Sequence, residues 1–152
     1  MPYKLTTSAA CRVARVDRDR FNEHVAAGRF PCAPETVPGR ARLFDPDDMI
    51  ALCLFRELMD DGLDATRSGR IACAVAEAAR RNPDEPFIAY VEYYVGKIGD
   101  TAFPEQVLDA TKRGYLRRGL PIRKVTSFNV GKLRELIASG TDEERSIVGE
   151  ND

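Results

Sequence analysis

The chain has 152 residues, enough for one ordinary domain or two small ones, and a hydrophobic share of 43% that suffices for a core. The 31% share of charged residues and an apolar run no longer than Met49 to Phe55 argue against a membrane protein. The net charge is −1, but residues 1–43 carry a net charge of +4 and residues 44–66 one of −6. A surface that binds a polyanion needs local positive charge, and the first block supplies it.

The four cysteines stand singly along the chain, and the only histidine, His24, is not at ligand spacing from any of them. Zinc sites and disulfide frameworks show tighter clustering, so the sequence predicts free thiols and no metal site. Cys11, Cys53 and Cys73 fall in apolar helical stretches, where a thiol behaves as a small buried hydrophobe. Cys32 lies in a loop-like stretch and is the candidate for redox or metal chemistry.

Since no charged and then apolar leader opens the chain, the expected compartment is the cytoplasm.

Two short helices are predicted at the start of the chain. Thr6 and Thr7 are suitable caps for a helix over residues 8–15. Residues 16 and 17 read as a turn, and Asp17 caps a second helix over residues 18–27 that stops at Gly28. Two helices joined by a tight turn, the second with polar groups outward, are typical of a helix-turn-helix.

The next stretch, residues 29–44, contains prolines and a glycine and ends in an alternating segment, so we expect a loop or a hairpin with arginines at its tip. Asp45 then caps a helix that has Pro46 in its first turn and runs to Gly62. Asp64 starts another helix, which closes near residue 81 before Pro83.

The second half is predicted to be a small mixed unit. Residues 87–95 are rich in aromatic and β-branched side chains and predict a strand, and residues 121–130 predict a second strand. Helices are expected over residues 103–115 and 131–138, and residues 141–152 read as an acidic, flexible tail. Such a unit buries little surface, so it should complete its core against the first half, against a second copy, or against both.

The spacing of particular residues carries a resemblance. Cys11 is followed five positions later by Val16, then after five more by Phe21, and after seven by Gly28. A proline-bearing stretch follows and ends in the residues Arg-Leu-Phe at 42–44.

Residues 45–48, Asp-Pro-Asp-Asp, then open an apolar helix that closes on residues 58–63, Leu-Met-Asp-Asp-Gly-Leu. In this order and spacing the first 80 or so residues resemble the MerR family of regulators. The family has Arg-x-Tyr at the end of its wing and Leu-x-x-Gly at the close of this helix. The chain departs from the family at residues 22–24, where Asn-Glu-His stands in place of Arg-Tyr-Tyr.

The resemblance implies an α+β protein, mainly α with a small β content. Its parts would be a winged helix-turn-helix over residues 1–82, a small αβ dimerisation or effector region over residues 83–140, and the tail. It implies a bacterial, nucleoid-associated transcription regulator that binds double-stranded DNA as a homodimer, with RNA polymerase as a further candidate partner. The recognition helix would be residues 18–27 in the major groove, and the wing would be residues 39–44 on the backbone.

Arg18 and Asn22 lie four positions apart, on one helical face, and could read base edges together. Other basic residues would hold the DNA backbone or the minor groove, and Arg18 and Arg20 would replace part of the family's missing contacts. The expected DNA-binding residues are Arg12, Arg15, Arg18, Arg20, Asn22, Arg40 and Arg42.

Two alternatives stay open. The winged helix could bind protein instead, as in a phage-type adaptor or assembly protein. Tyr90, Tyr93 and Tyr94 could line a ligand pocket or a dimer surface, although aromatic residues on a strand usually belong to the core. An enzyme is disfavoured because the sequence has no phosphate-binding Gly-x-x-x-x-Gly-Lys motif, metal cluster or nucleophile partnered with a histidine, and no cofactor is expected.

Overall fold

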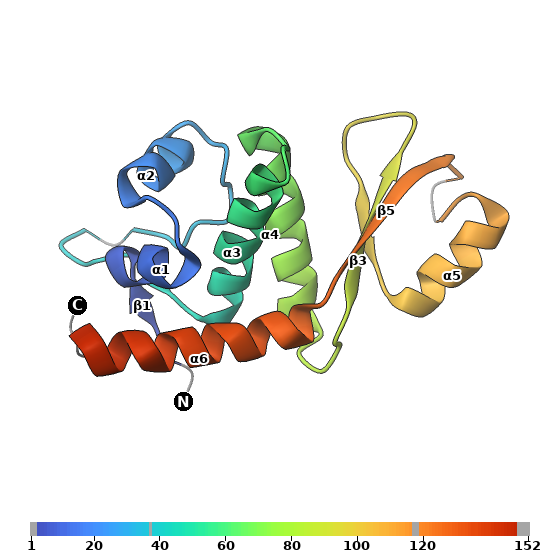
Figure 1. Cartoon of the computed structure of the whole chain (residues 1–152). Helices are drawn as coiled ribbons and strands as arrows, with labels where there is room; N and C mark the ends of the chain where they lie inside the picture. The colour runs from blue at the N-terminus through green and yellow to red at the C-terminus, as the bar shows by residue number, and fades with distance from the viewer. Residues whose placement is uncertain (1–2, 37, 117–118, 149–152) are drawn as a thin grey trace.

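The computed structural model describes residues 3–36, 38–116 and 119–148. It is a mixed α and β protein, as expected, in which a group of helices packs beside a small sheet (Figure 1). The elements in chain order are β1 (Leu5–Thr6), α1 (Thr7–Ala14), α2 (Arg18–Ala26), β2 (Leu43–Phe44), α3 (Pro46–Asp60), α4 (Ala65–Arg81), β3 (Ile88–Tyr93), β4 (Asp100–Ala102), α5 (Pro104–Arg113), β5 (Ile122–Phe128) and α6 (Val130–Val148).

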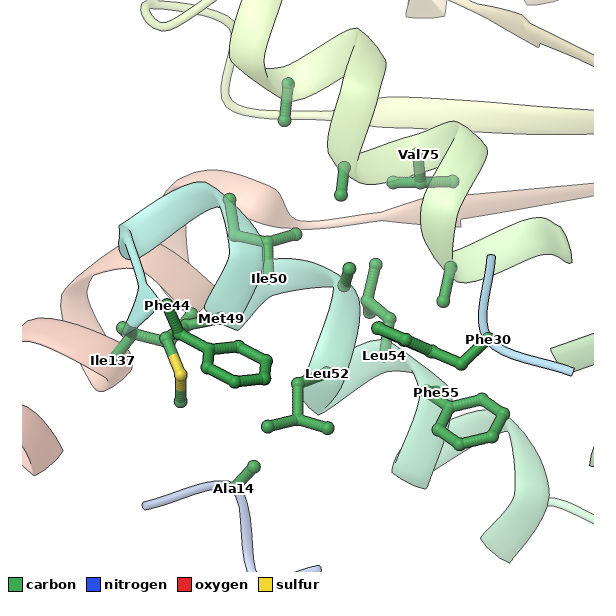
Figure 2. Packing of buried hydrophobic residues seen from close by; sticks show 14 of the residues in the cluster. Ala14, Phe30, Phe44, Met49, Ile50, Leu52, Leu54, Phe55, Val75 and Ile137 are labelled. Carbon is green, nitrogen blue, oxygen red and sulfur yellow. The ribbon is translucent and has the colours of Figure 1, made fainter. Parts of the chain in front are cut away.

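The core is built on α3 and α4, which form an antiparallel pair. Both helices begin where the sequence predicts: the side chain of Asp45 accepts from the backbone N–H of Asp48, and that of Asp64 accepts from the N–H of Arg67. Figure 2 shows how side chains of α3 meet those of the neighbouring elements, with Phe30, Phe44 and Ile137 reaching α3 from other parts of the chain. The burial of this apolar surface is the main favourable contribution to folding.

The described part of the stretch between α2 and α3 is a loop, which is one of the two forms expected, and not a hairpin. Among its described residues, strand structure is limited to β2, and β2 pairs antiparallel with β1 at the start of the chain instead of folding back on its own loop. The prolines and Gly39, whose φ is +80°, keep residues 31–36 and 38–41 irregular.

The second sheet has three antiparallel strands in the order β4-β3-β5. Side chains of β3 alternate between two faces. Ile88 and Tyr90 join the main core, whereas Val91 and Tyr93 join a second cluster with Ala110 of α5. One face of the sheet region therefore does complete its core against the first half of the chain. Strand β4, which lies between the predicted elements, was not expected.

Helix α6 corrects the predicted tail. It was expected to end at residue 138, but it continues to Val148 and packs across α1 and α3 (Figure 1). Gly140 lies inside the helix, and a Cβ there would lie 3.1 Å from Cγ1 of Val13, so this glycine allows close contact between α6 and α1. Farther along, Glu144 accepts from Nε of Arg12 at 2.6 Å. Residues 149–152 of the predicted tail lie outside the described residues.

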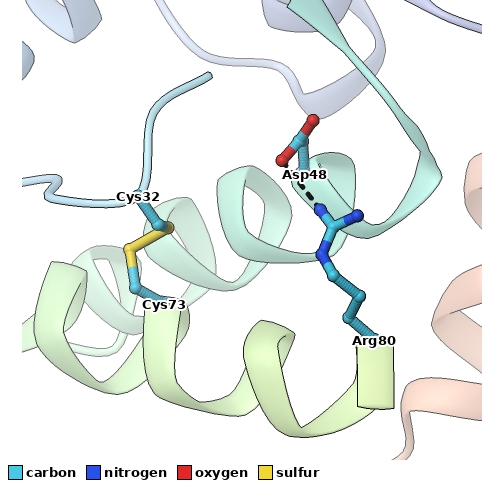
Figure 3. Close-up of a disulfide and its surroundings, with 4 residues drawn as sticks. All are labelled: Cys32, Asp48, Cys73 and Arg80. Atoms are coloured by element: carbon cyan, nitrogen blue, oxygen red, sulfur yellow. Dashed lines mark hydrogen bonds and ion pairs between the residues drawn. A yellow bond between two sulfur atoms is a disulfide. The ribbon is translucent and has the colours of Figure 1, made fainter. Parts of the chain in front are cut away.

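A disulfide corrects the prediction of free thiols. Cys32 in the loop after α2 is bonded to Cys73 on α4, and the two Cα atoms are 5.6 Å apart (Figure 3). The two cysteines are 41 positions apart in sequence, so no short spacing motif could have predicted the bond between them. Cys11 and Cys53 are free, and burial raises the pKa of their thiols to about 11 and about 12. Both are protonated near neutral pH and are therefore weak nucleophiles.

Near the end of α4, Arg80 donates hydrogen bonds to Asp45 and Asp48 at the start of α3 and lies 3.7 Å from a third carboxylate, that of Asp47 (Figure 3 shows the contact with Asp48). Its Nη atoms lie 2.8 Å from Asp45 and 3.0 Å from Asp48. Burial opposes ionisation of Asp45, but hydrogen bonds from Arg80 and from the backbone of Asp48 outweigh it and lower the pKa of Asp45. Burial and the charge of Asp45 raise the pKa of Asp48 from 3.8 to about 6.

This raised pKa predicts a pH dependence of stability. Between pH 3.8 and about 6, Asp48 is protonated in the folded protein and ionised in the unfolded chain. The free energy of unfolding contributed by Asp48 is therefore fully present below pH 3.8 and is lost as the pH rises to about 6. We expect Asp48→Asn to remove this decline in urea unfolding curves measured across that range. The matched control Asp60→Asn, at the exposed end of the same helix, should retain it; an unchanged decline in Asp48→Asn would contradict the assignment.

Candidate nucleic-acid interface

Helices α1 and α2 are joined by a turn of three residues. The side chain of Thr6 caps α1 by accepting from the N–H of Ala9, and α1 ends at Arg15 in the left-handed conformation, with φ of 60°. Asp17 caps α2 by accepting from the N–H of Arg20 at 2.9 Å. These contacts fix the angle between the two helices, and both side-chain caps were predicted.

Helix α2 is held to the core by one side, through aromatic contacts. Phe21 is fully buried and its ring centroid lies 5.3 Å from that of Phe30 and 5.9 Å from that of Phe44. His24 is half-buried and meets Phe55 edge to face. Burial, then the charges of Arg29 and Arg20, lower the pKa of His24, so it is neutral near pH 7.

The other side of α2 is open to solvent. It exposes Arg18, Asp19, Arg20, Asn22 and Glu23. The Arg18 side chain is 57% exposed, and its Nη1 donates to Oγ of Ser8 on α1 at 3.0 Å. This contact orients Arg18 at the junction of the two helices while leaving part of its guanidinium accessible.

The predicted DNA-binding residues divide into two groups. Arg12, whose side chain is 43% exposed, is paired with Glu144 of α6, and Arg42 donates to the carbonyl of Pro34 and to Oγ1 of Thr36, so these two arginines also make contacts within the protein. The remaining predicted residues are exposed, and they are Arg15, Arg18, Arg20, Asn22 and Arg40. The loop that carries Arg40 projects on the side of the molecule that carries α1 and α2 (Figure 1).

Of the three tyrosines considered for a pocket, Tyr93 and Tyr94 line the same cavity, and Tyr90 is not part of its lining. Tyr90 is buried in the main core, and its hydroxyl accepts from the N–H of Gly99 at 2.9 Å. Tyr93 is buried on the opposite face of the sheet and donates to Asp100 at 2.6 Å. Tyr94 is 69% exposed. The first two therefore position the segment that links β3 to β4, and Tyr94 is the accessible one.

Sequence reasoning missed some functional features that depend on the fold. Arg29 donates to the ring of His24 from beyond the end of α2, and Glu92 accepts from both Arg67 and Arg123. Glu92 is 25 and 31 positions from its two partners, so the sequence has no local signature of these contacts. Across the part of the chain that the structure describes, acidic, cysteine and histidine side chains form no group of three that could hold a metal ion. Within the same residues, none of the helices has the length and apolar character needed to cross a bilayer.

No protein-family model matches the chain, and the curated proteins contain no sequence that matches it.

Proposed function

We propose that this protein is a transcription regulator that binds double-stranded DNA in a sequence-selective way through the exposed side of α2. The observation that carries the proposal is the placement of Arg18 and Asn22 on this surface, one helical turn apart, on a helix fixed by the turn at residues 15–17. An arginine can bond the O6 and N7 atoms of guanine, and an asparagine the N6 and N7 atoms of adenine. A helix that exposes both side chains suits a major groove.

The flanking basic residues support the same proposal. Arg15 lies in the turn before α2, Arg20 lies on α2, and Arg40 lies in the loop that follows it. Contacts of this kind hold the phosphate backbone and set the register of a protein on the duplex without reading sequence. The winged helix-turn-helix arrangement and the homodimer expected from the MerR resemblance belong to this proposal, because two copies would read a palindromic site.

The test begins with selection of bound duplexes from a random library, followed by fluorescence anisotropy with the selected duplex. We expect Arg18→Ala and Asn22→Ala each to weaken binding of the selected duplex by about 1–3 kcal/mol. Arg15→Ala should weaken binding of every duplex, whatever its sequence, and reduce the salt dependence of binding. The control Arg113→Ala removes an exposed arginine of α5 and should leave affinity unchanged. A palindromic selected site bound by two chains is the result expected of a dimer.

Absence of salt-dependent duplex binding at low ionic strength would contradict the proposal. A protein-binding adaptor is the second candidate, favoured by Asp19 and Glu23, which place negative charge among the arginines on the same exposed side of α2. Arg18→Ala that abolishes capture of a protein partner while DNA binding stays intact would favour the adaptor.

A further inference from the structure

A polar cavity of about 430 Å³ lies where the start of α4 meets the sheet and the segment linking β3 to β4. Its volume is within the range of small-molecule sites, about 300–1,000 Å³. It lies on different elements from the exposed side of α2 described above. The charged side chains that line it are Asp64, Arg67, Arg70, Glu92, Lys97 and Arg123.

The lining carries more positive than negative charge. Four of these side chains are basic and two are acidic, which leaves a net charge of +2. Glu92 is shared, because Nε of Arg67 and Nη2 of Arg123 both donate to its Oε2 at 3.1 Å. One carboxylate thus serves two guanidinium groups. By contrast, the cavity between α1, α3 and α6 has three arginines and three glutamates, and its charges balance.

The basic groups of the cavity are already positioned. Glu92, whose side chain is only 12% exposed, orients Arg67 and Arg123, while the side chains of these two arginines remain 32% and 41% exposed. Arg70 donates to the backbone carbonyl of Lys97 at 3.0 Å. Guanidinium groups have several N–H donors in one plane, so each can bond Glu92 or Lys97 and still donate to an oxyanion.

An aromatic surface adjoins this charge. Tyr94 and Ile98, both on the segment between β3 and β4, line the cavity and are 69% and 64% exposed. The segment is held in place by the hydroxyl groups of Tyr90 and Tyr93, so the tyrosine ring lies beside the cavity before any ligand arrives. A ring of a ligand could stack on Tyr94 while its charged group meets the arginines.

We propose that this cavity is a binding site for a small phosphate monoester that carries an aromatic ring. A phosphate monoester has a charge of about −1.5 to −2 at pH 7, which matches the excess of +2, and three oxygens to accept from several guanidinium groups. A carboxylate would leave half of that charge unmatched. The ring would pack on Tyr94 and Ile98. The site is independent of DNA binding by α2.

The test is isothermal titration calorimetry with phenyl phosphate, benzoate and inorganic phosphate at constant ionic strength. We expect saturable binding of one phenyl phosphate per chain, about tenfold tighter than that of benzoate. Arg70→Gln and Arg123→Gln should each weaken phenyl phosphate binding by about tenfold or more. Tyr94→Ala should weaken binding of phenyl phosphate but not of inorganic phosphate. The control Arg113→Gln, outside the cavity, should bind as the unmodified protein does.

Urea unfolding midpoints show which variants keep their stability. Of the two arginine variants, Arg70→Gln is expected to disturb the fold less than Arg123→Gln, because Arg70 contacts a backbone carbonyl and its loss leaves the contacts of Glu92 intact. The proposal is overturned if phenyl phosphate does not saturate, if benzoate binds as tightly, or if Arg70→Gln and Arg113→Gln have the same affinity. It is also overturned if Arg123→Gln weakens binding of a DNA duplex but not of phenyl phosphate. The cavity would then hold a phosphate of the DNA backbone.

Discussion

Replacing Gly69 by alanine is expected to lower the free energy of unfolding by about 3 kcal/mol. Gly69 lies inside α4, where alanine would ordinarily gain about 1 kcal/mol in helix propensity. A Cβ at this position, however, would lie 1.8 Å from the carbonyl oxygen of Arg29 and 2.9 Å from its carbon. These are backbone atoms of the segment that leaves α2, so the clash can be relieved only by moving that segment away from α4. Urea unfolding followed by circular dichroism measures the loss.

Gly140→Ala is the matched control for this substitution. Gly140 also lies inside a helix, but its nearest neighbour is the terminal Cγ1 of Val13 at 3.1 Å, a side-chain atom that can shift by a few tenths of an ångström. We expect a change of no more than about 1 kcal/mol, because the propensity gain and the crowding oppose each other. A Gly69→Ala protein as stable as the unmodified one would show that α4 and the segment at Arg29 are not in such close contact.

The second large effect is expected from loss of the Cys32–Cys73 disulfide. A bond between residues 41 positions apart restricts the unfolded chain, and the loop-entropy model gives about 4 kcal/mol for a loop of this length. Replacing both cysteines by serine should therefore lower the free energy of unfolding by about 3–4 kcal/mol. A reducing agent should destabilise the unmodified protein by a similar amount and have no effect on the double variant, which is the internal control.

Thiol counting provides a direct check of this bond. Under denaturing conditions without a reductant, the unmodified protein should show two reactive thiols, those of Cys11 and Cys53. Four thiols in freshly purified protein would contradict the disulfide. Such bonds are rare in reducing compartments, so the redox state of this pair in the cell also bears on the cytoplasmic location expected from the sequence.

The predictions that agree with the structure depend on neighbouring residues. Thr6, Asp17, Asp45 and Asp64 each satisfy backbone N–H groups within three positions, so the start of a helix can be predicted from a short stretch of sequence. The strands β3 and β5 also follow from their own aromatic and β-branched residues. The exposure of Arg18 and Asn22 follows from the apolar spacing of α2, which assigns Phe21 to the buried side.

The predictions that failed concern contacts between distant parts of the chain. Gly140 is a helix stop when it is considered alone and a packing residue once α1 lies against α6. The ion pair between Arg12 and Glu144, which are 132 positions apart, was likewise not predicted. Strand β4 has only three residues and depends on pairing with β3. Propensity and charge counts contain no information on such pairs, because tertiary contacts decide them.

The position of α6 also has a consequence for how the chain folds during synthesis. This helix covers α1 and α3, so Val130 and Ile137 reach the main core only after the ribosome has made the sheet and the first part of α6. Until then the first helices emerge with part of their apolar surface uncovered. Contacts of such long sequence separation slow folding, and the exposed intermediate is the state in which nascent chains are most prone to aggregation or to capture by a chaperone.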